Sequence, residues 1–249
     1  MEELGSGAFA AVRYVGETGS TNADAAELLG DPRFAGLTIV AEYQTRGSGR
    51  KGRSWLAQPG TALLFTTILP RPIDSDRLWT VPFWTALAVG RALDVCGVAA
   101  ALQWPNDLLI DDRKVAGILC TSRVTGRNAH VGCGVGINVH RRAGAQAGIE
   151  PPPAFCDDRN PSIVRATLLR AILAEFDATL DALDDAERVA RAWESAAGLP
   201  GKRYRLLEDG ASTSFEATAL GLDRGGGLIV ARETGERETI ALADARVLR

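Results

Sequence analysis

The chain has 249 residues, of which 46% are hydrophobic and 24% charged, and its formal net charge is −3. This length allows one large domain, or a large and a small one, with a core that needs no disulfides or metals. A protein that holds nucleic acid through its phosphates usually has a broadly basic surface, so the acidic balance argues against that class.

The sequence also disfavours secreted, membrane and metal-centred proteins. We expect no signal peptide and no membrane span, because no basic segment followed by an apolar run opens the chain and no apolar stretch is long enough. His130 and His140 have no carboxylate or cysteine partner nearby in sequence, which argues against a histidine base or a metal site. Without C-x-x-C spacing, the cysteines are expected to be reduced thiols of a cytoplasmic protein: Cys96, Cys120, Cys133 and Cys156.

Apolar periodicity predicts strands and helices in the first 140 residues. A short helix over 23–29 follows Ser20-Thr21-Asn22, which are natural helix caps, and a longer helix covers 79–96. Glycine alternates with apolar residues over 130–139, and this indicates a strand to which a neighbour or a ligand approaches closely. The other expected strands are 12–15, 37–42, 60–69, 101–104, and the hairpin strands 108–110 and 115–120.

The character of the sequence changes after residue 198. Before it, a Gly- and Pro-rich loop over 141–160 leads to a long helix capped by Ser162, and Asp184 begins another helix that runs to about Ala197. After it, glycine-containing turns separate short segments typical of strands in a small barrel: 204–207, 214–220, 228–232 and 238–242. We predict an α+β domain over 1–198 and a small β domain over 199–249.

The segment Gln44-Thr45-Arg46-Gly47-Ser48-Gly49-Arg50-Lys51-Gly52-Arg53-Ser54-Trp55 has four cations and three glycines within residues 46–53. Glycine lets a backbone bend close to a ligand, and arginine offers a forked donor to carboxylate or phosphate. We call residues 46–53 the basic loop. It suits closure over a small anion, although a solvated basic turn would have the same pattern.

Four other segments carry polar groups that suit the same task. Ser20-Thr21-Asn22 begins a helix, where free N–H groups suit a polar ligand as well as a cap. Trp104-Pro105-Asn106-Asp107 places an amide and a carboxylate after a proline turn. Lys114 precedes Val115-Ala116-Gly117-Ile118-Leu119, and the glycine-rich strand Gly132-Cys133-Gly134-Val135-Gly136-Ile137-Asn138 ends in an amide.

These five motifs, in this order, resemble biotin protein ligases. That family has Ser-Thr-Asn near the start, a Gly-Arg-Gly-Arg-x-Gly-Arg loop followed by Trp, Lys-Trp-Pro-Asn-Asp, a Lys before Ala-Gly-Ile-Leu, and Gly-x-Gly-x-Asn. The resemblance covers about residues 12–249. It implies a mixed β-sheet catalytic domain flanked by helices, like that of class II aminoacyl-tRNA synthetases, and a small C-terminal SH3-like β-barrel.

The resemblance implies a two-step reaction with biotin, ATP and Mg²⁺. The biotin carboxylate attacks the α-phosphorus of ATP, and a lysine of a biotin carboxyl carrier protein then attacks the mixed anhydride. The residues agree with this reaction, because cations in a pliable loop offset the repulsion between a carboxylate and a triphosphate. A closing loop would also protect the anhydride from water.

The resemblance also implies a role for individual residues. Lys114 and Arg50 would be catalytic. The biotin site would comprise Ser20, Thr21, Asn22, Gln44, Gly47, Ser48, Gly49, Arg50, Lys114 and Gly117. The nucleotide site would comprise Arg50, Arg53, Trp55, Asn106, Asp107 and Asn138, with Asn106 and Asp107 also near Mg²⁺. Core packing is an alternative role for Trp55 and Trp104.

Two expected cations are missing from the motifs. Ser48 stands where the family has the first loop arginine, and Gln103 stands where it has the lysine before Trp-Pro-Asn-Asp. Our hypothesis is that Arg46 replaces the first, in which case Arg46→Ala would weaken biotin binding or adenylation by roughly tenfold or more. The alternative is slower activation or looser retention of the adenylate.

Three rival functions remain open at this stage. A lipoate ligase or octanoyltransferase would share the core fold but has different loop and lysine motifs. The missing cations motivate a non-catalytic biotin or adenylate sensor. A nucleic-acid binder is disfavoured by the acidic balance.

The sequence leaves the carrier protein and the oligomeric state open. Members of the resembled family are often dimers along a sheet edge, so a homodimer is an expectation of the resemblance. Many also carry an N-terminal helix-turn-helix domain, and about a dozen residues before the first strand are too few for one. We therefore expect a ligase without a DNA-binding domain.

Overall fold

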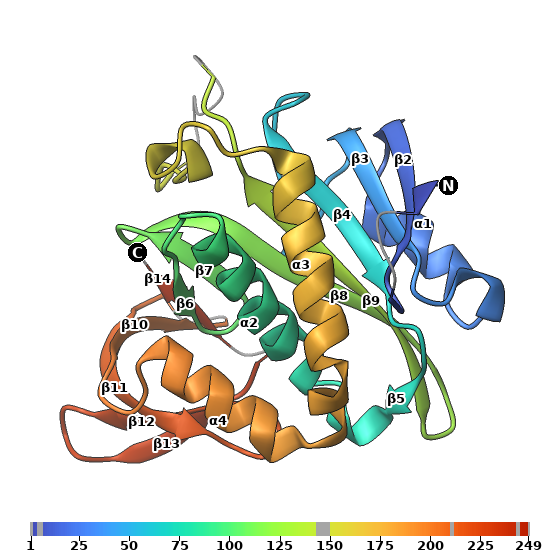
Figure 1. Cartoon of the computed structure of the whole chain (residues 1–249). Coiled ribbons are helices and arrows are strands. Elements are labelled where there is room, and N and C mark those ends of the chain that lie inside the picture. Colours follow the sequence, from blue (N-terminus) through green and yellow to red (C-terminus); the bar gives the residue numbers. More distant parts are fainter. Residues whose placement is uncertain (1, 4–6, 143–149, 210–211, 243–244, 249) are drawn as a thin grey trace.

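The computed structural model describes residues 2–3, 7–142, 150–209, 212–242 and 245–248. Its larger sheet has nine strands in the order β1-β2-β3-β4-β9-β8-β7-β6, and β5 pairs with β9 (Figure 1). β2 and β3 are parallel, and the other strand pairs among the described residues of this sheet are antiparallel. The strands are β1 (Glu2–Glu3), β2 (Ala11–Thr18), β3 (Thr38–Gln44), β4 (Ala62–Ile68), β5 (Ile73–Asp74), β6 (Ala101–Gln103), β7 (Asp107–Ile110), β8 (Arg113–Thr125) and β9 (Asn128–Asn138).

Helices cover both faces of this sheet. α2 (Thr80–Val95) and α3 (Arg165–Thr179) pack against one face in the main core, and Figure 1 shows them side by side in front of the strands. α1 (Thr21–Leu28) covers the other face through a smaller apolar cluster. Ile39 belongs to that cluster and Val40 to the main core, because successive side chains of a strand point to opposite faces. The predicted mixed sheet flanked by helices is confirmed.

The second sheet has five antiparallel strands in the order β13-β12-β11-β10-β14. α4 (Ala186–Ala197) lies between it and the first sheet, and Trp104 Nε1 donates to the Gly226 carbonyl oxygen at 3.2 Å. The strands are β10 (Arg203–Glu208), β11 (Phe215–Leu222), β12 (Leu228–Arg232), β13 (Arg237–Ile240) and β14 (Ala245–Leu248). The predicted short strands are confirmed, and the barrel form and domain boundary stay predictions.

Several predicted boundaries were wrong. Ser162 does not cap α3, whose N-cap is Val164, and the Ser162 N–H instead donates to Asn160 Oδ1 at 3.0 Å. α3 ends at Thr179, and a 3₁₀ helix over Leu180–Asp184 follows. Asp185, one residue later than expected, caps α4 by accepting the Arg188 N–H. Short 3₁₀ helices also occur at Pro32–Phe34, Arg50–Gly52, Ser75–Arg77 and Cys156–Asp158.

Two strained residues bring β8 back along β7. Asp111 and Asp112 have φ values of 49° and 58°, a left-handed conformation that asparagine, aspartate and glycine tolerate best. The pairing of β7 with β8 shifts its register between Leu108 and Leu109, close to this turn. β8 then continues to Thr125, well beyond the expected end at residue 120, because pairing with β9 maintains a strand whose last residues are exposed. In the described residues, no helix has the length and apolar character needed to cross a membrane.

Trp193 of α4 belongs to the core between the two sheets, so its loss should lower the stability of the fold. Its side chain is 1% exposed, and its ring lies 4.9 Å from that of Phe83 on α2 in an edge-on arrangement. We expect Trp193→Ala to lower the free energy of unfolding by about 3–5 kcal/mol, because the substitution leaves a cavity. Urea denaturation measures the change. Val95→Ala, at a side chain that is 76% exposed, is the control and should change it by under about 0.5 kcal/mol.

Candidate active site

A cavity of about 480 Å³ lies where the basic loop, the start of α1 and strands β8 and β9 meet. Hydroxyls and amides, three cations, one carboxylate and several apolar side chains share its wall. Its lining residues are Ser20, Thr21, Asn22, Gln44, Ser48, Gly49, Arg50, Arg53, Ser54, Trp55, Leu56, Phe65, Asn106, Lys114, Gly117, Ile118, Leu119, Gly134, Val135, Gly136, Asn138, Glu150, Pro151 and Pro153.

Glycines on β8 and β9 make room for two of these side chains. A Cβ atom at Gly134 would lie 2.1 Å from Asn22 Oδ1, and one at Gly136 would lie 2.7 Å from Trp55 Cε2. Gly117 pairs with Gly136 on the neighbouring strand, and a Cβ atom added to Gly117 would lie 3.1 Å from the same indole. Separations this short exclude any larger residue without a rearrangement. The close approach expected from the glycine pattern is confirmed, and the groups that approach are Asn22 and Trp55.

At the start of α1, a hydrogen-bond network fixes the polar end of the cavity. Gln44 Oε1 accepts from the Thr21 N–H at 2.7 Å and from the Thr21 hydroxyl at 3.0 Å. Asn22 Nδ2 donates to the Leu119 carbonyl oxygen at 2.9 Å, and Thr66 Oγ1 donates to Asn22 Oδ1 at 2.8 Å. Ser20 is the N-cap residue but makes no side-chain capping hydrogen bond. Thr21 and Asn22 therefore bond to residues of β3, β4 and β8, and no side-chain cap explains the motif.

The basic loop folds back on itself beside this network. The Trp55 N–H donates to the Gly47 carbonyl oxygen at 2.8 Å, and the Gly49 N–H donates to that of Arg53 at 2.6 Å. Gly47 is needed at the neck, because a Cβ atom there would lie 2.6 Å from the Trp55 carbonyl oxygen. Lys51 points away from the cavity and lies 2.5 Å from Asp209, just beyond β10.

Arg50 links the loop to both sheets. Its Nη1 donates to Asn106 Oδ1 at 3.4 Å, and its Nη2 donates to the Leu242 carbonyl oxygen. Burial lowers the pKa of Arg50, and the nearby Asp107 carboxylate opposes that effect. A guanidinium titrates far above neutral pH, so this half-buried side chain stays cationic. An anion that enters the cavity would compensate its lost hydration.

Lys114 follows the strained turn and faces the same cavity. Its Nζ lies 2.5 Å from Asp107 Oδ1 and 5.4 Å from the centroid of the Trp55 ring. Asn138 Nδ2 donates to the Lys114 carbonyl oxygen at 3.3 Å. The Trp55 Nε1 donor is buried and has no hydrogen-bond partner within the described part of the chain.

The structure brings most of the predicted site residues together. Two of them do not line the cavity: Gly47 lies at the neck of the loop, and Asp107 lies behind Lys114. Trp104 is 1% exposed and belongs to the main core, as its alternative role predicted. The residues that do line it are Ser20, Thr21, Asn22, Gln44, Ser48, Gly49, Arg50, Arg53, Trp55, Asn106, Lys114, Gly117 and Asn138.

Among the described residues, neither missing cation is replaced at the cavity wall. Arg46 does not line the cavity, and its guanidinium packs beside Gly19, with Nη2 2.9 Å from where a Cβ would stand. The proposed substitution of Arg46 for the arginine missing at Ser48 is therefore not supported by the position of the side chain. Gln103 is 7% exposed and does not line the cavity.

The predicted site lacked several lining residues: Ser54, Leu56, Ile118, Leu119, Gly134 and Gly136, and the two groups that follow. Phe65 and Val135 reach the cavity from β4 and β9, and their apolar character alone did not separate them from the core. Glu150, Pro151 and Pro153 come from the loop predicted over 141–160. Within that loop, residues 143–149 lie outside the described residues.

The chemistry of the site rests on cations and hydrogen bonds. Among the described residues, no group of three or more His, Cys, Asp or Glu side chains is arranged to hold a metal ion. Neither His130 nor His140 lines the cavity. All four cysteines are free thiols, and burial raises the pKa of Cys156 to about 12, which leaves it protonated and unreactive.

The sequence of the chain is similar to that of known proteins. The model described as the biotin/lipoate A/B protein ligase family matches residues 20–138. A biotin–[acetyl-CoA-carboxylase] ligase of Paracoccus denitrificans is 33% identical over 91% of this chain and 96% of its own length. BirA bifunctional ligase/repressors of Bacillus spizizenii and Bacillus subtilis are 32% and 33% identical, but the matches cover only 39% and 38% of those proteins.

A solved structure has the same fold over nearly the whole chain. The biotin protein ligase of Aquifex aeolicus, in complex with biotin and ATP, matches with a TM-score of 0.77. The match has 24% identity and covers 97% of this chain and 100% of that one. The structure shows the shared fold, and the Paracoccus relative, which aligns over almost its full length, shows the family. The chain belongs to the biotin protein ligases, within the biotin/lipoate A/B protein ligase family.

Proposed function

We propose that the chain is an ATP-dependent biotin–protein ligase. In the first step, a carboxylate oxygen of biotin bonds to the α-phosphorus of ATP, and pyrophosphate leaves. In the second, the amine of a carrier lysine bonds to the acyl carbon of biotinyl-5′-AMP, AMP leaves with the bonding electrons, and the amine loses a proton. The observation that carries the proposal is the convergence of Arg50, Arg53 and Lys114 on one cavity whose other end is uncharged.

The uncharged end suits biotin. Ser20, Thr21, Asn22 and Gln44 provide hydroxyl and amide groups for a ureido ring, and Phe65 and Val135 provide apolar surface for an alkyl chain. Ser48, Gly49 and Gly117 complete this part of the wall, with Gly47 shaping the loop.

The cationic end suits the nucleotide. Arg50 and Arg53 face the phosphates, and Trp55 offers its indole face and its Nε1 donor. Asn106 and Asn138 supply amides. Lys114 lies between the two ends, where the biotin carboxylate and the α-phosphate would meet.

Catalysis in this proposal comes from positioning and charge. Cations placed where negative charge gathers lower the barrier to joining a carboxylate and a phosphate, and they act more strongly away from water. Half-burial of Arg50 supports such a role. The mixed anhydride needs protection from hydrolysis, which the basic loop and residues 150–153 would provide.

Magnesium would enter with the triphosphate. Mg²⁺ is usually held by one or two carboxylates together with substrate phosphates and water. Asn106 lines the cavity with its Oδ1 3.4 Å from Arg50 Nη1, whereas Asp107 does not line it and its Oδ1 lies 2.5 Å from Lys114 Nζ. These two side chains would hold the ion only by exchanging the present cations for it, with phosphate as its main ligand. When bound, the ion would neutralise phosphate charge.

Residues 199–249 are proposed to be a small SH3-like domain that helps to place the basic loop. The contacts of Lys51 with Asp209 and of Arg50 with the Leu242 carbonyl support that role. The partner is proposed to be a biotin carboxyl carrier protein in the cytoplasm, where free thiols such as Cys120 and Cys133 persist.

The decisive assay is incubation with biotin, MgATP and a biotin carboxyl carrier domain. We expect the carrier mass to increase by one biotinyl group, and by nothing when its acceptor lysine is replaced by arginine. Lipoate in place of biotin should leave the carrier mass unchanged, and efficient transfer of lipoate would favour a lipoate ligase. Biotin binding without pyrophosphate release would favour the sensor.

Lys114→Met should abolish adenylation while the protein remains folded. We expect biotin-dependent pyrophosphate release to fall by about 100-fold or more, as when a charge-stabilising donor is removed. Release within threefold of the wild-type rate would exclude Lys114 from the chemistry. The thermal unfolding midpoint provides the control for folding.

Two arginines of the basic loop form a matched pair. Arg50 lines the cavity and Arg46 does not, so Arg50→Ala should lower adenylation by about 100-fold and Arg46→Ala by under about threefold. Steady-state kinetics with biotin and ATP varied separately makes the comparison. A tenfold loss in Arg46→Ala would restore the hypothesis that Arg46 replaces the missing loop arginine.

A further inference from the structure

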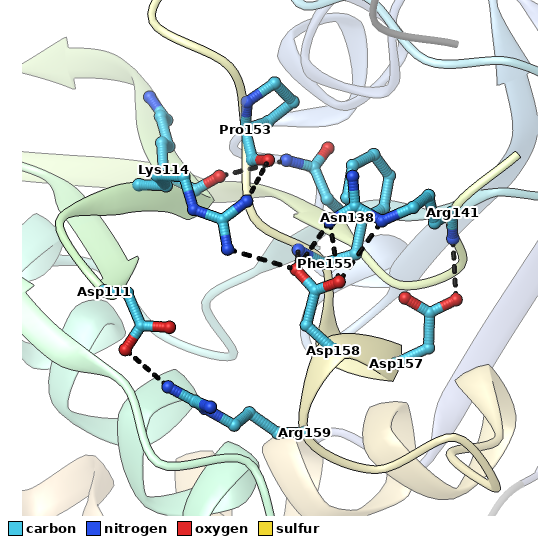
Figure 2. Close-up of polar contacts among 10 residues, drawn as sticks. Asp111, Lys114, Asn138, Arg141, Pro153, Phe155, Asp157, Asp158 and Arg159 are labelled. Atoms are coloured by element: carbon cyan, nitrogen blue, oxygen red, sulfur yellow. Dashed lines mark hydrogen bonds and ion pairs between the residues drawn. The ribbon is translucent and has the colours of Figure 1, made fainter. Parts of the chain in front are cut away.

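The wall segment, residues 150–158, forms one side of the cavity and returns the chain from β9 toward α3. Pro151 and Pro153 line the cavity near Lys114 and Asn138. In the described part of the chain the segment belongs to no strand or α-helix, and its last residues form a 3₁₀ helix. Its position comes from two backbone hydrogen bonds and from side-chain contacts. The Ala154 N–H donates to the Lys114 carbonyl oxygen at 2.9 Å and the Asp157 N–H to that of Val139 at 3.0 Å. Figure 2 shows the side-chain contacts gathered around the carboxylate of Asp158.

Asp158 holds the wall segment from within. Its Oδ2 accepts the Phe155 N–H at 3.0 Å, and its Oδ1 lies 2.6 Å from Arg141 Nη2 (Figure 2). The Arg141 guanidinium also lies 4.8 Å from the centroid of the Phe155 ring, and Arg113 Nη2 is 3.6 Å from Asp158 Oδ2. Although burial opposes ionisation, the hydrogen bonds from Arg141 and Phe155 hold the pKa of Asp158 below its usual range. The carboxylate is charged at neutral pH.

The same contacts reach the backbone of Lys114. The Lys114 carbonyl oxygen accepts the Ala154 N–H at 2.9 Å and the Asn138 amide at 3.3 Å. Arg113, its neighbour in sequence, donates to the Pro153 carbonyl oxygen at 3.5 Å. The wall segment and the strand that carries Lys114 are thus fixed to each other, with Asp158 bonded to both.

We propose that Asp158 is a positioning residue for the nucleotide half of the site, acting through the wall segment and the Lys114 backbone. It touches no cavity surface itself. Its carboxylate sets where Pro151 and Pro153 stand and keeps Ala154 bonded to Lys114. The proposal deepens the ligase function and rests on it for the kinetic readout.

Asp158→Asn tests the proposal, because it keeps the size of the side chain and removes its charge. We expect the KM for ATP in pyrophosphate release to rise about tenfold, as a lost charge-assisted contact would cause, with the KM for biotin unchanged within about twofold. Asp158→Glu should bring the KM for ATP back to within about threefold of wild type. A merely structural role would move both KM values together, or neither.

Asp181→Asn is the matched control. Asp181 forms an exposed ion pair with Arg188 far along the chain from the site, and its side chain is 66% exposed. The KM values of Asp181→Asn for ATP and biotin should equal those of the wild type. Equal KM values for ATP in Asp158→Asn and in the wild type would overturn the proposal.

Hydrogen–deuterium exchange separates this proposal from the ligase function. In Asp158→Asn without ligands, the peptide containing Ala154 should exchange about tenfold faster, while that of Asp181→Asn should not change. Unaltered exchange at Ala154 would overturn the positioning role, whether or not the protein is active. A wild type that fails to release pyrophosphate, with faster exchange in the variant, would overturn only the ligase assignment.

Discussion

The site depends on close packing against the backbone of β8 and β9. Gly134 leaves room for Asn22, and Gly117 and Gly136, which face each other on neighbouring strands, leave room for the indole of Trp55. Any side chain at these positions would fill the space where the polar end and the basic loop approach the sheet. This constraint allows groups that are distant in sequence to share a single cavity, and it explains the spacing of glycines on β9.

The second requirement of the site is positive charge in the cavity, and three side chains supply it. Arg50, Arg53 and Lys114 reach the cavity, while Lys51 is committed to Asp209 and Arg46 packs beside Gly19. The local excess of positive charge is therefore smaller than the basic loop suggests. Two elements carry the three lining cations, since the loop carries both arginines and the β7–β8 hairpin carries Lys114. Joining two anions requires these elements to be fixed relative to each other, and the contacts of Arg50 and of the wall segment provide that.

Much of this arrangement could be predicted from the sequence, because motifs and periodicity are local properties. The strands, the main helices and most of the lining residues followed from caps, apolar spacing and the five motifs. The rest depends on contacts between distant residues. Nothing local distinguishes Asp158, which bonds to Arg141, from the other carboxylates of its loop. The direction of Arg46 and the extension of β8 to Thr125 were likewise set by neighbours, namely Gly19 and the paired strand β9.

The central claim is that one cavity holds a carboxylate and a phosphate between the loop arginines and Lys114. A crystal structure with a non-hydrolysable analogue of biotinyl-5′-AMP tests it most directly. We expect the phosphate mimic within hydrogen-bond distance of Lys114 Nζ and of the Arg50 or Arg53 guanidinium, with the bicyclic ring beside Asn22 and Gln44. An analogue bound elsewhere, or bound here with Lys114 and both arginines turned away from it, would contradict the account.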